Sequence, residues 1–358
     1  MPDMRFAPPN PIRIADRVNG LNAVSVRSHN ERLVLALLLQ HGGTSRMAIG
    51  EKTGLSAQTV SVIVRSLEKE GLVAKGKAQK GRVGPPTIPM SLNPEGAYSV
   101  GISIGFRKTE VVLINFVGTV VSHKTLQHET AGDHHVHPDI FTTTEAILAD
   151  LPAKKRLRVA GIGLALPDQF EDSEPLEQMR QRLEEAFALE VFVQNDVTAA
   201  AGGESLFGVA RDLDNYLFFY IGAKIHSRLI LNHQIYNGAS TKPYDVGLLE
   251  LERGLGSNAV YADELWERSR HLENFDAALA DWQKKCVELI KSKLDELGQF
   301  VDVKTVVLSS YIPPEICRTI CDHLALENDA VAAIVGSLDR APKAVGAASL
   351  PFASRFMV

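Results

Sequence analysis

The feature that most constrains the fold is a pair of short helices predicted near the N-terminus and joined by a tight turn. Thr44-Ser45 can cap the first helix, which lies in SRMAIGEKTG and ends at Gly54. Ser56 can cap the second helix, which lies in AQTVSVIVRSLEKEG and ends at Gly71. A further helix is predicted before them, over 29–40. Two short helices joined in this way are typical of a helix-turn-helix motif.

The second helix of the motif has two different faces at about 100° per residue. One face is apolar and is predicted to pack inward, with Val60, Ile63, Val64 and Leu67. The opposite face holds Gln58, Ser61, Val62 and Arg65. A glutamine and an arginine on an exposed face suit base edges in the major groove of DNA. The pattern is equally compatible with the ordinary solvated face of an amphipathic helix.

The segment after this helix favours the DNA-binding interpretation. LVAKGKAQKGRVGPPTIPMSL alternates like a strand, breaks at a basic, glycine-rich tip and continues as a strand, which is the pattern of a β-wing. Lys75 and Lys77, together with the tip residues Lys80 and Arg82, are available there for phosphates. We therefore expect this domain to bind a double-stranded DNA operator. The residues expected to contact DNA are Ser45, Arg46, Ser56, Gln58, Thr59, Ser61, Arg65, Lys80 and Arg82.

The charge distribution sets this N-terminal segment apart from the rest of the chain. Residues 1–92 carry 13 Lys and Arg against 6 Asp and Glu, a balance of +7, whereas residues 93–358 have a balance of −12, within a net charge of −5. A basic segment on an acidic body indicates that the segment meets a polyanion, although charge alone is also compatible with a chance fluctuation.

Turn residues at 93–96 predict a boundary between two domains, residues 1–92 and residues 93–358. After the boundary, YSVGISIG, TEVVLINFVG and TVVSHKTLQ read as three strands, and helices and strands alternate from there on. A later group of strands repeats the theme. The pattern predicts an α/β fold with two similar lobes and a cleft between them.

The cysteines and the apolar segments indicate where such a chain works. Cys286, Cys317 and Cys321 are odd in number and form no CxxC pair, so a disulfide framework is not expected. Cys317 and Cys321 lie four apart on a predicted helix, where small buried hydrophobic residues are a better explanation than a metal pair. No apolar stretch has the length of a membrane span, and we expect a cytoplasmic protein with no membrane contact.

At this point a family resemblance is visible. The chain resembles the regulator branch of the ROK family (repressors, open reading frames and sugar kinases), which carries an N-terminal winged helix-turn-helix. The resemblance is carried by VRSHNERLVLALLLQHGGTSRMAIGEKTGLSAQTVSVIVRSLEKEGLV, LNPEGAYSVGISIG, VFVQNDVTAAAGGE and LILNHQIYNGAS. It implies an actin-like, sugar-kinase-type domain with the ligand between the lobes. Lobe one is expected over about 93–190 plus the C-terminal helix, and lobe two over about 191–335.

The resemblance also implies positions for a ligand site. Asn195, Asp196 and Gly238 stand at positions that the family uses near the sugar, and Asp245 stands where glutamate is usual. Carboxylate and amide groups suit sugar hydroxyls because each can form paired hydrogen bonds. We expect these four residues to bind a sugar or a sugar derivative. The loss of the family's sugar-contacting histidine at Leu248 indicates that the ligand is not the family's ordinary hexose.

The phosphate-binding parts of the family's kinases are not retained. The first hairpin lacks the acidic residue and has Phe106 and Arg107 in the turn. The second loop reads Gly-Ala-Lys-Ile-His-Ser-Arg over 222–228, so only its first glycine remains, and side chains there obstruct the approach of backbone to phosphate. The adenosine-site glycines are replaced near 309–311. We expect no ATP-dependent activity and no cofactor.

The zinc motif of the family is also missing. The Gly-His position reads Gly247-Leu248, and no cysteine lies between 249 and 285. Tetrahedral zinc requires four nitrogen or sulfur donors, so we expect no metal.

Asp196 therefore has three possible roles. In the family's kinases the matching aspartate is the general base, which has nothing to catalyse without a phosphoryl donor. The alternatives are a ligand clamp, which we favour, and an ordinary helix cap formed by Asn195-Asp196.

The expected function is a transcription regulator, a repressor of carbohydrate-related genes that responds to a sugar-like effector. Two alternatives are a regulator that answers to a protein partner and a ROK sugar kinase. Because winged helices usually read paired half-sites, we expect a homodimer or homotetramer.

Overall fold

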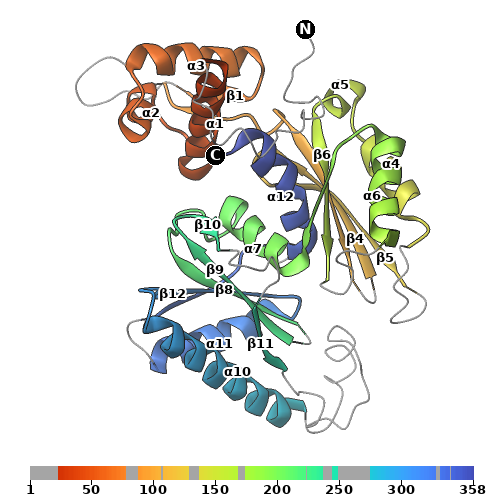
Figure 1. The fold of residues 1–358 in the computed structure, drawn as a ribbon, viewed down its shortest axis with the longest axis vertical. Coiled ribbons are helices and arrows are strands. Elements are labelled where there is room, and N and C mark those ends of the chain that lie inside the picture. The colour runs from red at the N-terminus through yellow and green to blue at the C-terminus, as the bar shows by residue number, and fades with distance from the viewer. Residues whose placement is uncertain are drawn as a thin grey trace.

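The computed structural model describes residues 23–77, 88–105, 108–128, 137–167, 174–222, 224–236, 244–248, 275–327, 331–338 and 340–358. Its helices and strands, in chain order, are α1 (Ala23–His41), α2 (Arg46–Thr53), α3 (Ala57–Lys69), β1 (Val73–Lys75), β2 (Met90–Leu92), β3 (Tyr98–Ile104), β4 (Lys108–Asn115), β5 (Val120–Gln127), α4 (Ile140–Ala149), α5 (Ala153–Arg156), β6 (Val159–Leu166), α6 (Glu174–Phe187), β7 (Val191–Asn195), α7 (Asp196–Phe207), β8 (Tyr216–Ile221), β9 (Lys224–Leu231), β10 (Gln234–Ile235), β11 (Tyr244–Leu248), α10 (Phe275–Gly298), β12 (Thr305–Ser310), α11 (Pro314–Glu327), β13 (Ala332–Val335) and α12 (Pro342–Phe356). Figure 1 shows a small helical domain at the upper left, one α/β body beside it at the upper right and a second α/β body below.

The small domain is a winged helix-turn-helix, as the sequence predicts. Ser45 and Ser56 cap α2 and α3, since their hydroxyl oxygens accept hydrogen bonds from the backbone of Ala48 and Thr59. Gly54 ends α2 at a φ of 70°, in the left-handed region where glycine has no steric penalty. Strands β1 and β2 pair antiparallel and form the base of the wing. The wing tip lies outside the described residues.

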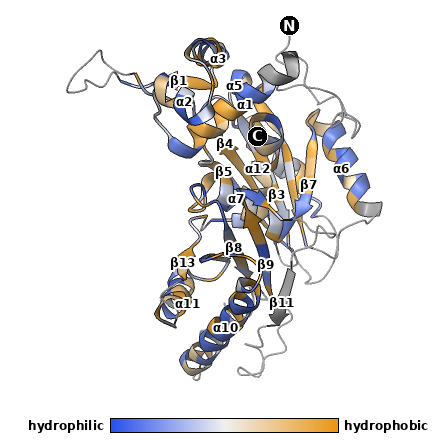
Figure 2. Ribbon diagram, turned by 60° about the vertical axis from the view of Figure 1, so that its left-hand side comes forward, coloured by the Kyte–Doolittle hydropathy of each residue, from blue (hydrophilic) through white to orange (hydrophobic). Residues whose placement is uncertain are grey.

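Lobe one is built on a five-stranded sheet in the order β5-β4-β3-β6-β7. The predicted strands β3, β4 and β5 form an antiparallel meander, and β6 and β7 add parallel to it. On one face, apolar residues of β3 and β6 pack with α4 and α6. Figure 2 shows mainly hydrophobic residues in β3 and β4, which fits strands covered on both faces.

Lobe two is built on a second sheet in the order β10-β9-β8-β12-β13, with β11 paired to β9. Strands β8 and β9 form an antiparallel hairpin, whereas β12 and β13 are parallel to β8. Helices α10 and α11 cover one face through a cluster that includes Trp282, Ile290 and Ile320. All three cysteines are buried in this cluster with free thiols, and burial raises the pKa of Cys317 to about 12, so they behave as core residues.

Helices α7 and α12 form the layer between the two sheets. Helix α12 packs against the face of the lobe-one sheet that is turned toward lobe two. Helix α7 packs against β8 and β9 of lobe two. The two helices pack against each other so closely that a side chain at Gly346 would collide with the backbone carbonyl of Ala199. Small residues therefore place the start of α7 and the start of α12 at the junction of the lobes.

The boundary between the lobes differs from the expected position near residue 191. Strand β7 pairs with β6 and belongs to the lobe-one sheet, and the second sheet begins only with β8 at Tyr216. The sequence interpretation placed the boundary too early because a strand's partner is set by tertiary pairing and not by its own residues.

The winged-helix domain and lobe one share one hydrophobic core. Leu35 and Leu38 of α1 belong to the same buried cluster as Phe116 after β4 and Phe352 and Phe356 of α12. The three phenylalanine rings meet edge to face, with centroids of Phe116 and Phe356 4.9 Å apart. The small domain is thus packed onto lobe one through α1 and α12.

A second connection between these two parts is polar. Arg158, at the start of β6, donates one hydrogen bond to the carbonyl of Glu70 over 2.9 Å and another to the carbonyl of Gly96 over 2.6 Å. One guanidinium therefore joins the end of α3 to the turn at 93–96, between the two predicted domains.

Candidate functional site

The exposed face of α3 is the first candidate site. Gln58, Val62 and Arg65 are exposed and Ser61 is half-buried, whereas the residues that face the core are fully buried. Val62 is 55% exposed although it is apolar. This face therefore presents an amide, a guanidinium and one apolar side chain to whatever lies against α3.

The hydroxyl groups expected at this site have structural roles in addition. Ser56 Oγ lies 2.9 Å from Thr59 Oγ1 and accepts a hydrogen bond from the Thr59 backbone, so both side chains stabilise the start of α3. Ser45 does the same for α2. Arg46 is half-buried, and its Nε is enclosed without a hydrogen-bond partner among the described residues. The exposed Arg65 is therefore a stronger candidate for a DNA contact than Arg46.

The wing is described only at its base. Lys75 forms a salt bridge with Glu68 of α3 at 2.5 Å, and Lys77 is exposed. Lys80 and Arg82 lie outside the described residues, so their expected phosphate contacts stay a prediction.

The start of α7 is the second candidate site, and Asn195 is its helix cap. The Asn195 Oδ1 accepts hydrogen bonds from the backbone of Val197 over 2.9 Å and of Thr198 over 3.1 Å. These bonds satisfy two of the free N–H groups at the helix start. The cap function that was one alternative for this pair is thus performed by Asn195.

Asp196 makes a different set of contacts. Its Oδ2 lies 2.5 Å from Nζ of Lys343, in the first turn of α12, and its Oδ1 accepts a hydrogen bond from the Val197 backbone. The ammonium of Lys343 also lies 4.5 Å from the ring centroid of Tyr220 on β8. The Asp196 side chain is 8% exposed and that of Lys343 is 27% exposed, so the pair lies at the edge of the protein interior.

No sequence signal pointed to Lys343. The two residues are 147 positions apart, and Lys343 belongs to none of the motifs that carry the family resemblance. Only the packing of α12 against α7 brings them together.

A fully buried cation also lies beside the same helix. Arg228 on β9 is fully buried, and its Nε donates a hydrogen bond to Thr198 Oγ1 over 2.6 Å. The stretch from Lys224 onward is a regular strand that pairs with β8 and β11. The arginine that the sequence analysis described as an obstruction in the second phosphate loop is thus part of the interior of lobe two.

Glu204, one turn before the end of α7, is a further buried group that sequence reasoning did not single out. Its carboxylate accepts hydrogen bonds from the backbone of Leu338 over 2.9 Å and of Val209 over 3.1 Å. These two residues lie on the two chain segments that cross between the lobes. Burial raises the pKa of Glu204, while the hydrogen bonds act against that rise.

For the two other expected ligand residues, Gly238 and Asp245, the structure shows less. Asp245 lies on β11, opposite His226 in the antiparallel register with β9. Gly238 lies outside the described residues, as do Phe106 and Arg107 of the first hairpin. The structure therefore places Asn195 and Asp196 at the lobe junction. The roles of Gly238 and Asp245 stay predictions.

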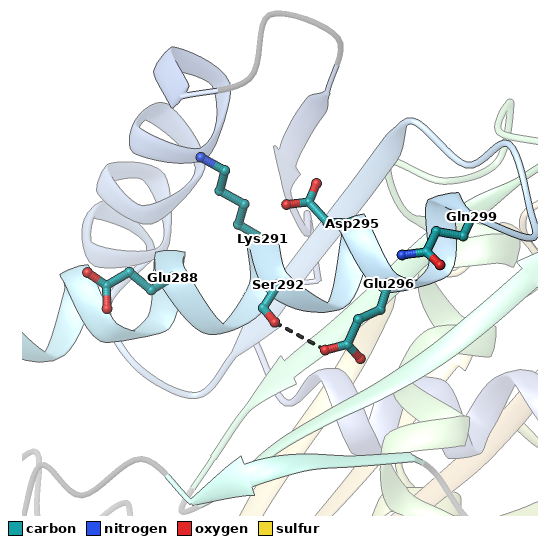
Figure 3. A pocket seen from close by; sticks show the side chains of 6 residues that line it. All are labelled: Glu288, Lys291, Ser292, Asp295, Glu296 and Gln299. Carbon is teal, nitrogen blue, oxygen red and sulfur yellow. Dashed lines mark hydrogen bonds between the residues drawn. The ribbon is translucent and has the colours of Figure 1, made fainter.

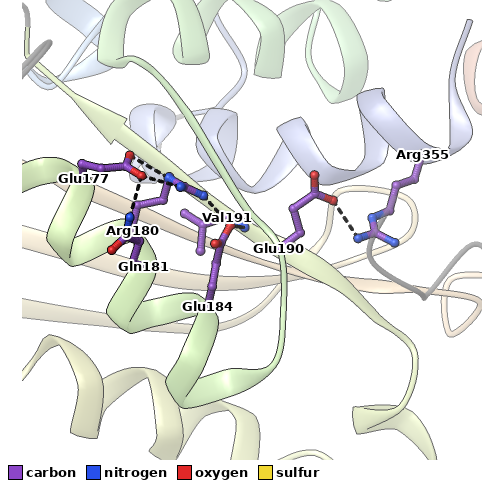
Figure 4. A network of polar contacts seen from close by, with 7 residues as sticks. All are labelled: Glu177, Arg180, Gln181, Glu184, Glu190, Val191 and Arg355. Carbon is purple, nitrogen blue, oxygen red and sulfur yellow. Dashed lines mark hydrogen bonds and ion pairs between the residues drawn. The ribbon is translucent and has the colours of Figure 1, made fainter. Parts of the chain in front are cut away.

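A polar network fixes the strand that leads to this site (Figure 4). Arg180 of α6 pairs with Glu177 and Glu184, and Glu184 accepts a hydrogen bond from the backbone of Val191 at the start of β7. Beside it, Arg355 of α12 pairs with Glu190 at 2.9 Å. The start of β7 is therefore held by both helices that flank it.

The described residues contain no group of three or more metal-ligating side chains. A depression lies along α10, lined by residues between Glu288 and Gln299 (Figure 3). It is lined by polar side chains of α10 and by Gln299, which follows that helix, and Ser292 donates a hydrogen bond to Glu296 over 3.2 Å. No described helix is long and apolar enough to cross a membrane.

The chain matches two protein families. Residues 28–82 match the MarR family, and residues 99–247 match the ROK family. The protein y4fQ of Sinorhizobium fredii is 24% identical over 330 residues, which cover 84% of this chain and 82% of that protein.

Two named regulators are similar over a shorter stretch. The xylose repressor of Bacillus subtilis is 25% identical over 63% of this chain and 62% of its own length. The DNA-binding transcriptional dual regulator NagC of Escherichia coli is 22% identical over 64% of this chain and 59% of its own length. The match thus spans about three fifths of each of these relatives.

Solved structures share the fold. A ROK family transcriptional regulator, a homologue of the Escherichia coli Mlc protein, superposes with a TM-score of 0.62 and 17% identity over 92% of this chain and 98% of that one. The ROK hexokinase of Thermus thermophilus gives a TM-score of 0.50 and 17% identity over 70% of this chain and 96% of its own. The two-lobed α/β body therefore shares its fold with these ROK proteins, and the match with the regulator extends over nearly the whole chain.

Proposed function

We propose that this chain, which matches the MarR family over residues 28–82 and the ROK family over residues 99–247, represses genes by binding a double-stranded DNA operator and is controlled by a sugar-like ligand at the lobe junction. The observation that carries the proposal is the exposed face of α3, with Gln58 and Arg65, on a domain that shares a hydrophobic core with lobe one.

The DNA-binding part of the proposal is supported by the shape and the charge of the small domain. Helix α3 is held by α1 and α2 on its apolar face, so its polar face remains available to enter a major groove. The balance of +7 over residues 1–92 favours a polyanion over an acidic protein surface. The named relatives with a similar sequence are described as repressors or DNA-binding regulators.

The ligand part of the proposal is supported by Asp196. Because Asn195 is the helix cap, the second oxygen of Asp196 is available for another partner, which is Lys343 in this structure. A carboxylate and an ammonium side by side offer an acceptor and a donor, a combination that suits adjacent hydroxyl groups of a sugar or polyol. Gly238 and Asp245 complete the proposed site.

We propose no catalytic role for this site. Arg228 takes part in the interior of lobe two and Lys343 neutralises Asp196, so neither a phosphate loop nor a free general base is favoured. Incubation of the protein with ATP, magnesium and a panel of sugars should yield no sugar phosphate. Formation of a sugar phosphate that is lost in Asp196→Asn would establish a kinase instead.

The DNA proposal is tested by selection of binding sites from random duplex DNA with the full-length protein. We expect one enriched sequence with two half-sites separated by whole helical turns, bound by a homodimer or homotetramer. Enrichment of no sequence, with only salt-sensitive non-specific binding, would refute the operator proposal. The proposal places the protein in the cytoplasm, where DNA is accessible to it.

The ligand proposal is tested by thermal shift against a sugar library, because a ligand that binds the folded state raises the melting temperature. The alternative, a regulator controlled by a protein partner, predicts a selected operator but no shift with any sugar.

A further inference from the structure

Helix α12 touches both regions to which a function is assigned. At its first turn, Lys343 pairs with Asp196 at 2.5 Å. Near its other end, Phe352 and Phe356 lie in the hydrophobic cluster that contains Leu35 of α1. The helix therefore connects the lobe junction directly with the winged-helix domain.

The two ends of α12 are tied to the two ends of one strand. Lys343 pairs with Asp196, immediately after β7, and Arg355 pairs with Glu190, immediately before β7 (Figure 4 shows the second pair). The Arg355 side chain is only 7% exposed, and burial lowers its pKa while Glu190 opposes this change. Helix and strand are thus joined by one ion pair at each end.

The pair at the lobe junction is also the one that involves lobe two. Lys343 lies over the ring of Tyr220, which belongs to β8 of the second sheet. Its ammonium therefore contacts α7 and the second sheet together, whereas Arg355 and Glu190 both lie on lobe one. A movement of one lobe relative to the other would therefore alter the contacts of Lys343, and not those of Arg355.

The rest of α12 is closely packed. At Gly346 the helix packs with its backbone against Ala199, with no side chain between them. At the far end, the centroids of Phe352 and Phe116 lie 5.4 Å apart in an edge-to-face contact. Interiors packed at this density transmit displacements between their elements.

We propose that Lys343 is a positioning residue of the ligand site, and that α12 transmits the state of its pair with Asp196 to the winged-helix domain. In the ligand-free protein Lys343 holds the carboxylate of Asp196. A hydroxyl-bearing ligand that takes over this carboxylate releases the first turn of α12, and the displaced helix carries α1 with it. The ligand step rests on the proposed function, but the coupling between Lys343 and α1 does not.

The test uses the full-length protein and needs no identified ligand. Lys343→Met removes the charge at nearly constant length, Lys343→Arg retains it, and Asp196→Asn removes the pair from the other side. We expect amide hydrogen exchange in α1 and in the second half of α12 to be faster in the Met and Asn variants and unchanged in the Arg variant. Affinity for the selected operator should fall roughly twofold to thirtyfold, the range of such couplings.

Two comparisons separate coupling from a general loss of stability. Lys285→Met removes an ion pair of similar length, 2.6 Å to Asp281 within α10, and should leave exchange in α1 unchanged. The double variant Lys343→Met with Asp196→Asn should be no weaker in operator binding than Lys343→Met alone, because both substitutions break the same pair.

Faster exchange confined to α7 and the first turn of α12, with α1 as in the wild type, would refute the coupling. If Lys343→Met does not fold, Asp196→Asn and Lys343→Arg decide the same question. If no operator can be selected, the proposed function fails, but the exchange measurement still decides whether Lys343 is coupled to α1.

Discussion

The Nε of Arg228 donates a hydrogen bond to the hydroxyl of Thr198 over 2.6 Å, and this contact joins strand β9 to the first turn of α7. Both side chains are buried, and Arg228 lies opposite Phe218 in the β8–β9 hairpin. A cation has therefore become part of the interior at a position where glycine would be required for a phosphate. Removal of this arginine would leave a hole and would not restore a nucleotide site.

The first prediction concerns this contact. Thr198→Val keeps the shape of the side chain but removes the acceptor for Arg228, and we expect a loss of about 1–3 kcal/mol in the free energy of unfolding. Thr198→Ser keeps the hydroxyl and should lose much less. Urea unfolding of both variants provides the measurement, and equal stability of Thr198→Val and the wild type would show that the bond contributes nothing.

The second prediction concerns the exposed face of α3, with Gln58 and Arg65. Gln58→Ala and Arg65→Ala should each weaken specific operator binding by about 1–3 kcal/mol, because each removes hydrogen bonds to a base edge. Lys291→Ala on α10 is the matched control and should bind the operator as the wild type does. Fluorescence anisotropy with the selected operator and with a scrambled duplex gives both affinities. Full operator affinity in both α3 variants would show that the helix faces solvent only.

The third prediction concerns Val62, whose side chain is 55% exposed on the same face. An apolar side chain in a major groove can contact the methyl group of thymine. Replacement of one operator thymine by uracil should weaken binding of the wild type by about 0.8 kcal/mol, the value of one buried methyl-sized group. Val62→Ser should not distinguish the two bases at that position. An equal loss in both proteins would assign the methyl contact to another residue.

The fourth prediction concerns Glu204, which holds Leu338 and Val209 on the two segments that cross between the lobes. Glu204→Gln puts an amide N–H where backbone N–H donors converge but also removes a buried charge, so we expect a loss in the free energy of unfolding that is largest at low pH, where it should reach about 1–3 kcal/mol. Glu288→Gln on the solvated face of α10 is a suitable control and should be almost neutral.

The pH dependence of this loss follows from the raised pKa of Glu204. The folded protein binds the proton more tightly than the unfolded chain, whose glutamate pKa is about 4.3. Stability from this group is therefore present at low pH and decreases as the pH rises through the raised pKa. The stability of the wild type relative to Glu204→Gln should increase as the pH falls from 8 toward 5. The opposite slope in urea unfolding would show that the hydrogen bonds outweigh burial.

The helices of the winged-helix domain could be predicted because their determinants are local. Ser45, Gly54 and Ser56 cap and end their helices by bonds to residues a few positions away, and those bonds are present. The buried face of α3 follows from the helical period alone. Which hydroxyls remain for DNA was not predictable, since Ser56 and Thr59 also bond to each other.

The lobe junction was predicted only in part. The position of Asn195 and Asp196 between a strand and a helix follows from the sequence, and so does the cap. The partner of Asp196 does not, because Lys343 is brought there by the packing of two helices that are far apart in the chain. Strand β7 was assigned to the wrong lobe for the same reason.

The sequence by itself determined most helices and strands, the resemblance to a family and the absence of the glycines of the kinase loops, because these depend on short-range periodicity, capping and residue type. The tertiary structure alone decided what each retained polar group now does. A charged side chain that is buried is stable only with a hydrogen-bond or ion-pair partner, and the fold decides which partner is near. Asp196 therefore pairs with Lys343, and Arg228 donates to Thr198. Glu204 accepts from Leu338 and Val209, on the two segments that cross between the lobes.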